Sequence, residues 1–246
     1  MRRLDGLQHL RAVAALGVVA FHAGARYGLH QPIGPWDVDF WGLGERGVDI
    51  FFVLSGFLLW TTTSARPPRN PGAFLWARFK RLAPPYWLAT GALACAALFT
   101  GLYPHLTVEP LHVLSSLFFW PMLSPSHPPA IWPLLVPGWT LNYEMAFYVL
   151  FAAVLLVPAT RRLLVLAAAV GVLLLAGLIP VLPVPIDFWT RPLIVEFLFG
   201  VGIGAIWTSG RRHGVPVAAA LLSIGALALI FAPWVTHRSL MSGVPA

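Results

Sequence analysis

Long apolar segments recur along this chain, and short connections rich in Arg, Pro and Gly separate them. The segments fall at about 7–28, 43–63, 84–102, 110–123, 139–158, 163–182, 192–208 and 215–234. An apolar helix of about 20 residues crosses the hydrocarbon core of a bilayer and satisfies its own backbone hydrogen bonds. The pattern therefore predicts an all-α fold, a polytopic bundle of transmembrane helices built from about seven to eight apolar segments.

The composition supports a membrane domain and argues against a soluble one. Of the 246 residues, 58% are hydrophobic and only 10% are charged, whereas about 25% of residues are charged in ordinary soluble domains. We expect residues 1–246 to form a single integral membrane domain. The net charge of +7 comes from basic residues in the connections, which is typical of orientation signals and not of a nucleic-acid-binding face.

The basic connections predict the orientation in the membrane, because such connections are enriched on the cytoplasmic side. They lie at residues 66–81, 161–162 and 211–212. Segment 110–123 has about 14 residues, fewer than a spanning helix needs, so we expect a re-entrant or interfacial element there. This arrangement predicts seven crossings, a cytoplasmic amino terminus and an external connection at 121–137.

Two ionisable residues share one face of the first apolar segment. Arg11 and His22 are eleven residues apart, which returns to nearly the same face of a helix about 16 Å further along. Ionisable side chains inside a membrane span are costly and indicate a functional site. Two simpler interpretations remain open: Arg11 as an anchor at the inner surface, and His22 as a hydrogen-bonded packing residue.

Three carboxylates from other segments are expected at the depth of His22, roughly 8–9 Å below the outer surface: Asp49, Glu144 and Glu196. The basic cluster at residues 78–81 is expected near the inner surface with Arg11. This layering predicts a proton-transfer site with a cationic entrance below it.

Each carboxylate also has a simpler interpretation. Asp49 lies close enough to a span end to extend its side chain to the interface, and Glu144 has aromatic neighbours typical of an interfacial belt. Glu196 has Arg191 five residues before it as a partner for a structural ion pair. The other histidines, such as His112, are expected to be ordinary surface residues, and no metal-ligand spacing is present.

Five blocks of sequence, in order, carry a resemblance to a known family. They are Leu4–Leu7 followed by Arg11 and His22; Gly47–Leu59; Arg78–Leu82 with Pro84, Pro85 and Tyr86; Trp139–Glu144 with Phe147 and Tyr148; and Arg191 with Glu196–Gly200. Together they resemble the integral membrane acyltransferase family 3. The resemblance covers nearly all of the chain, and the second block is the most specific of the five.

The resemblance implies a membrane-bound O-acyltransferase of the bacterial cytoplasmic membrane. Such an enzyme moves an acyl group, often acetyl, from a cytoplasmic acyl-CoA to a hydroxyl of a glycan or glycosylated acceptor, as in O-acetylation of polysaccharides. It implies no permanently bound cofactor, because acyl-CoA serves as a co-substrate such as acetyl-CoA. The expected surroundings are the lipid bilayer and a glycan acceptor.

Carried over by motif, His22 is the catalytic residue, and Arg11, Arg78 and Arg81 face the donor. Guanidinium groups suit the phosphates of coenzyme A, and an imidazole suits removal of a proton from a hydroxyl. The carboxylate expected to orient the imidazole is either Asp49 or Glu144. Four residues are expected to support the substrate side: Glu196, Arg191, Trp139 and Asn142.

The chain departs from the family pattern in two places. Thr140 stands where the family usually has serine, and the chain ends at Ala246 where relatives continue through further spans. We therefore expect a domain that is incomplete at its carboxyl end, completed by a partner or by a second copy in a homo-oligomer. Two alternatives remain: a lipid-linked sugar transporter or flippase, which usually shows an internal repeat, and an inactive membrane subunit.

Overall fold

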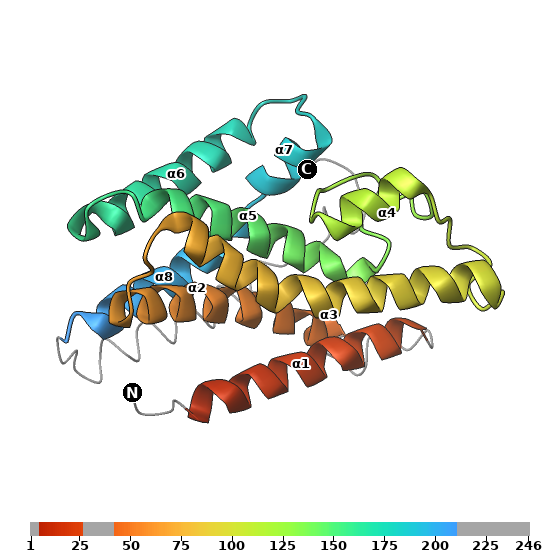
Figure 1. The fold of residues 1–246 in the computed structure, drawn as a ribbon, viewed down its shortest axis with the longest axis horizontal. Coiled ribbons are helices and arrows are strands. Elements are labelled where there is room, and N and C mark those ends of the chain that lie inside the picture. The colour runs from red at the N-terminus through yellow and green to blue at the C-terminus, as the bar shows by residue number, and fades with distance from the viewer. Residues whose placement is uncertain (1–4, 27–41, 211–246) are drawn as a thin grey trace, which may run out of the picture. The chain divides into compact units, whose positions relative to one another are not determined.

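The computed structural model describes residues 5–26 and 42–210 (Figure 1). Every regular element in those ranges is a helix. The chain divides into two compact units, which are treated separately below. Among the described residues, the first comprises 5–26, 42–65 and 196–210, and the second comprises 66–195.

The described part of the first unit is built from four helical elements. They are α1 (Asp5–Arg26), the 3-10 helix η1 (Gly42–Arg46), α2 (Gly47–Ala65) and α8 (Ile194–Thr208). Glycines let α2 and α8 cross closely. A Cβ atom built on Gly56 would overlap the carbonyl oxygen of Phe197, and one on Gly200 would overlap that of Val53.

The second unit contains the longest helix in the described ranges, α3 (Pro71–Phe99). Asn70 caps it by accepting a hydrogen bond from the amide of Ala73 at 2.7 Å, and Pro71 suits the first turn. The helix therefore begins well before the predicted segment 84–102. Pro84 and Pro85 lie inside the helix, although in sequence they resemble the start of a span.

The rest of the second unit follows α3 in chain order. It consists of α4 (Pro110–Leu117), η2 (Val136–Gly138), α5 (Trp139–Val154), η3 (Ala159–Arg161), α6 (Arg162–Ala176) and α7 (Val184–Thr190). Helices α3 and α5 lie side by side and antiparallel (Figure 1). The Phe74 ring meets Tyr148 at 6.2 Å near the start of α3, and the Tyr86 ring lies against Gly138 further along.

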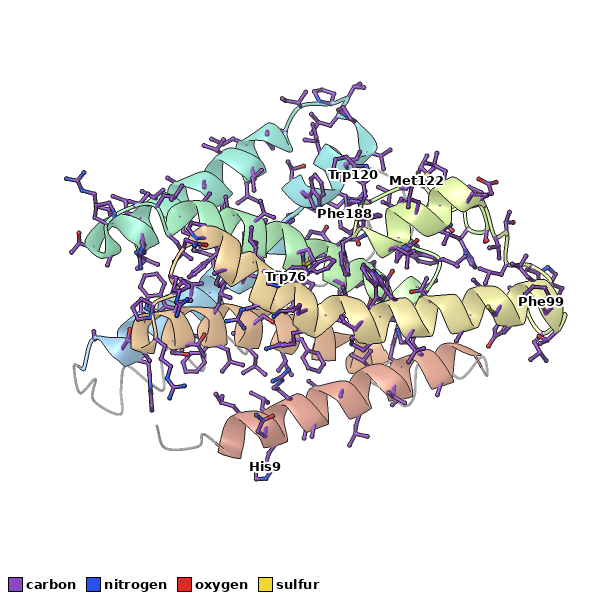
Figure 2. The ribbon with its side chains drawn as sticks, in the orientation of Figure 1. His9, Trp76, Phe99, Trp120, Met122 and Phe188 are labelled. Carbon is purple, nitrogen blue, oxygen red and sulfur yellow. The ribbon has the colours of Figure 1, made fainter. Side chains whose placement is uncertain are left out.

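Aromatic side chains from α5 and α7 form the core of the second unit. Tyr143 stacks on Phe188 with ring centroids 4.3 Å apart and donates its hydroxyl to the Phe188 carbonyl at 2.7 Å. Trp120, which follows α4, meets the ring of Trp189 edge-on at 5.2 Å. Figure 2 shows Trp120 and Phe188 at this same end of the unit.

Helix α4 has its polar side inward and its leucines outward. His112 is 1% exposed and its Nε2 lies 2.8 Å from the carbonyl oxygen of Trp132, so the prediction of a surface histidine was wrong. Ser116 accepts a hydrogen bond from a backbone amide of the same connection at 2.9 Å, whereas Leu111 and Leu114 are exposed. Side-chain hydrogen bonds therefore fasten the proline-rich connection 121–137 to α4.

The all-helical, membrane-type fold is confirmed, but the number of spans is not. Three helices in the described ranges are long and apolar enough to cross a membrane, at Gly44–Ala65, Pro71–Phe99 and Ala159–Ala176. The bent pair α7 and α8 would make a fourth. The count falls below seven because α5 has only 16 residues and because α1, although 22 residues long, is not among the helices apolar enough to cross. The predicted segment 215–234 and the basic pair 211–212 lie outside the described residues.

Candidate functional site

In the first unit, α1 packs tightly on η1 and the start of α2. A Cβ on Gly44 would overlap the carbonyl oxygen of Gly17, and a Cβ on Gly47 would overlap that of Ala14. Because Ala14 and Val18 lie on the stripe that also carries Arg11 and His22, this packing turns the stripe toward η1 and α2. Both ionisable side chains are partly buried.

His22 lies beside an acidic residue that the sequence analysis did not select. Its ring meets that of Phe21 edge-on at 5.2 Å, and Glu45 of η1 acts on it electrostatically. The close contact of Gly17 with Gly44 holds η1 against α1 at this level. The carboxylate that the structure brings near His22 within the first unit is therefore Glu45.

Arg46 lies within electrostatic range of three carboxylates in the first unit. They are Glu45 from η1, Asp49 from α2 and Glu196 from α8, and each acts electrostatically on its guanidinium. Asp49 is only 3% exposed, so its carboxylate is inside the protein and does not reach an interface. A buried charge needs a partner of opposite charge to offset its desolvation, and Arg46 supplies that charge among these acids.

Arg78 is the centre of a second charged site, in the second unit. Its guanidinium lies over the rings of Phe74 and Tyr148, at 5.4 and 5.7 Å from their centroids, and is close enough to Glu144 to interact electrostatically. The Tyr148 hydroxyl donates a hydrogen bond to the Glu144 carboxylate. Arg81 is exposed one turn along α3. The predicted match in depth between Glu144 and His22 stays a prediction, because they belong to different units.

The residues predicted to support the substrate side differ in burial and in their charged partners. Trp139 is partly buried with its ring 6.0 Å from Tyr143, and Asn142 is 1% exposed. Arg191 forms an ion pair with Asp187 at 2.8 Å. That pair gives Arg191 a partner one turn earlier in the chain, while Glu196 interacts with Arg46.

Sequence reasoning missed Glu45 and Arg46, although a signal for them exists. They are adjacent charged residues at the start of a long apolar segment, where charge is costly.

In residues 5–26 and 42–210, no group of three or more His, Cys, Asp or Glu side chains is arranged to hold a metal ion.

Comparison with known proteins adds a family match to this geometry. A family model described as "Acyltransferase domain" matches residues 4–243. The chain is 42% identical over 213 residues to the exopolysaccharide production protein ExoZ of Rhizobium meliloti, a match that covers 85% of this chain and 63% of ExoZ. It is 28% identical over 254 residues to the acyltransferase MdmB of Streptomyces mycarofaciens, covering 91% of this chain and 62% of MdmB.

The chain thus spans less than two thirds of the length of these two relatives. No solved structure matches it.

Proposed function

Because the chain belongs to the acyltransferase 3 family, we propose that it transfers an acyl group from a thioester to a hydroxyl within the membrane. The observation that carries this proposal is His22, a partly buried imidazole on α1 within electrostatic range of Glu45, whose element η1 packs against α1 at Gly17 and Phe21. An imidazole exchanges a proton near neutral pH, and a neighbouring carboxylate fixes its tautomer and steadies its charged form.

In the proposed reaction, His22 is the general base. It takes the proton of the acceptor hydroxyl while the hydroxyl oxygen attacks the thioester carbonyl carbon. The carbon–sulfur bond then breaks, the acyl group remains on the acceptor oxygen, and the thiolate leaves. The thiolate takes the proton back from the imidazolium, so His22 returns to its starting state. Glu45 replaces Asp49 and Glu144 as our proposed positioning carboxylate.

The proposed donor is an acyl-CoA, with acetyl as the acyl group. Planar guanidinium groups bind phosphate in a bidentate manner, and Arg78 and Arg81 provide two of them on one stretch of α3. Glu144 and Tyr148 fix the position of Arg78, while Arg81 is exposed and open to a ligand. We assign Arg11 to the same donor-binding role in the first unit.

The proposed acceptor is a glycan hydroxyl. The relative ExoZ is named for exopolysaccharide production, and carbohydrate hydroxyls are the groups that a general base can activate for attack on a thioester. We place this O-acylation in the bacterial cytoplasmic membrane, with the amino terminus and the donor on the cytoplasmic side. The basic connections 66–81 and 161–162 favour this orientation.

Sealed membrane vesicles with radiolabelled acetyl-CoA test the proposed function. Inverted vesicles, which expose the cytoplasmic face, are expected to transfer label to a glycan acceptor, and right-side-out vesicles are not. Movement of an unlabelled lipid-linked sugar without label transfer would instead identify a transporter. Absence of both, with the protein present and folded, would identify an inactive subunit.

Replacing Glu45 with glutamine tests its positioning role. We expect kcat to fall at least about tenfold with little change in the KM for donor or acceptor, because the imidazole is retained but loses its orienting charge. Glu45→Asp is expected to recover part of the loss. Glu109→Gln is the control, since Glu109 is exposed and its side chain makes no capping hydrogen bond. An unchanged kcat in Glu45→Gln would remove Glu45 from the mechanism.

A further inference from the structure

Three polar side chains in the seam between α3 and α5 have buried atoms that find no hydrogen-bond partner among the described residues. These atoms are the Tyr86 hydroxyl, the Thr90 hydroxyl and Oδ1 of Asn142. Their residues are 5%, 0% and 1% exposed. We call Tyr86, Thr90 and Asn142 the seam residues.

Thr90 differs from the other threonines of the described α-helices. Each of the others donates its hydroxyl to a backbone carbonyl three or four residues earlier, as helical threonines commonly do: Thr61, Thr62, Thr63, Thr140, Thr190 and Thr208. Thr90 makes no such bond. Its hydroxyl lies near that of Tyr86, one turn earlier on the same helix, without the geometry of a hydrogen bond between them.

The three seam residues share one side of the helix pair. The ring and hydroxyl of Tyr86 lie against Gly138, at a distance that leaves no room for a Cβ atom there. Asn142 is four residues after Gly138 and therefore lies on the same face of α5. The buried polar residues of both helices thus lie on the faces along which α3 and α5 meet.

The surroundings of the seam are apolar. Ala83 and Phe119 pack with Tyr86 as a buried cluster, and the partly buried side chains around it are Phe79, Leu135, Leu141 and Met145. An apolar wall with a few well-placed polar groups is typical of a small-molecule site. A buried polar group without a partner is costly, and native proteins keep few of them. Three in one seam indicate a ligand that supplies the missing bonds.

We propose that the seam residues bind the amide-bearing pantetheine arm of the acyl-CoA donor. The hydroxyls of Tyr86 and Thr90 donate to amide carbonyl oxygens, and Oδ1 of Asn142 accepts from an amide N–H. A slender chain that alternates amides with methylene groups matches both the polar atoms and the apolar wall. This inference rests on the proposed function, because it assumes that acyl-CoA is the donor.

The position along α3 supports this choice of ligand. Arg78 precedes Tyr86 by eight residues, which is about 12 Å along a helix. A donor whose phosphates bind at Arg78 and Arg81 would extend its arm along α3 toward Tyr86 and Thr90. The phosphate-binding groups and the amide-binding groups therefore occur in the order in which the donor carries their ligands.

The two halves of the donor allow a direct test on the detergent-solubilised full chain. The probes are ADP, which has phosphates without the arm, and pantetheine, which has the amides without phosphates. Each is measured as an inhibitor of acetyl-CoA-dependent labelling and by its shift of the melting temperature. The variants are Tyr86→Phe and Thr90→Val, which remove only a hydroxyl and keep the shape of the side chain, together with Asn142→Leu.

We expect each seam variant to weaken pantetheine about three- to tenfold, the loss of one neutral hydrogen bond, and to leave ADP binding unchanged. Arg78→Ala is expected to do the reverse. Without ligand, Tyr86→Phe and Thr90→Val are expected to keep the melting temperature or raise it, because the hydroxyls that they remove are unsatisfied. Thr63→Val is the control, since it removes a buried hydroxyl already bonded to Leu59 at 2.7 Å and should change the binding of neither probe.

Three outcomes would overturn the inference while the proposed function stands. They are unchanged pantetheine binding in all three seam variants, a raised KM for the glycan acceptor in place of the donor, and a lower melting temperature of ligand-free Tyr86→Phe. The last would mean that bound water satisfies the hydroxyl. A wild-type chain that transfers no label and binds neither ADP nor pantetheine would instead overturn the proposed function.

Discussion

Replacing His22 with alanine is expected to lower acyl transfer by at least about a hundredfold, the usual contribution of a general base. The loss should fall on kcat, because the substitution removes the group that accepts the hydroxyl proton and leaves the charged residues of α3 in place. His22→Gln should be equally inactive, since an amide forms hydrogen bonds but does not accept a proton at neutral pH. The measurement is the initial rate of label transfer from acetyl-CoA.

His9→Ala is the matched control for this experiment. His9 lies on the same helix, is exposed, and is labelled near the start of α1 in Figure 2. Its removal should leave both the rate and the melting temperature unchanged. If label transfer in His22→Ala continues at the wild-type rate, His22 is not the base and the proposed mechanism fails.

Replacing Gly200 with valine is expected to cause the largest loss of stability. Even a Cβ atom at Gly200 would overlap the carbonyl oxygen of Val53 and lie 2.8 Å from the amide nitrogen of Phe57. Both neighbours are backbone atoms of α2, so the two helices must separate to make room. We expect a cost of about 1–3 kcal/mol or more, as for other overpacked cores. Thermal unfolding in detergent measures it.

Gly202 provides the control on the same helix. A Cβ at Gly202 would meet nothing within 4 Å, and alanine favours a helix over glycine by about 1 kcal/mol. Gly202→Ala should therefore keep or raise the melting temperature, while Gly200→Ala should lower it. Equal effects of the two alanine substitutions would mean that α2 and α8 do not cross at Gly200.

Much of the fold was predictable because membrane helices can be recognised in a sequence by their length and apolar composition. The predicted segments 43–63 and 192–208 lie close to α2 (Gly47–Ala65) and α8 (Ile194–Thr208). The prediction failed at α3, where Pro84 and Pro85 were read as the beginning of a span. In a membrane helix, neighbouring groups can compensate the backbone bonds that proline removes, so proline is a weaker boundary signal there than in a soluble helix.

The candidate site was predictable only in part. Which residues share one face of a helix can be read from the sequence, whereas which residues of different helices touch cannot. The common face of Arg11 and His22 follows from the helical period alone. The approach of Glu45 to His22 depends on the glycine contact between α1 and η1, which no periodicity reveals. The seam residues were missed for a related reason: whether a tyrosine or threonine hydroxyl is satisfied depends on its neighbours in space.

The two prolines inside α3 have a consequence for mutational experiments on ligand binding. Proline has no amide hydrogen, so Pro84 and Pro85 supply no helical hydrogen bond to the carbonyl oxygens of Lys80 and Arg81. Main-chain oxygen atoms are thereby made available between the guanidinium of Arg78 and the hydroxyl of Tyr86. Alanine substitutions elsewhere in α3 would leave these carbonyl oxygens available; only substitutions of Pro84 and Pro85 would occupy them, because they restore the amide hydrogens. Mutating side chains alone therefore does not test every hydrogen-bond acceptor that α3 presents to a ligand.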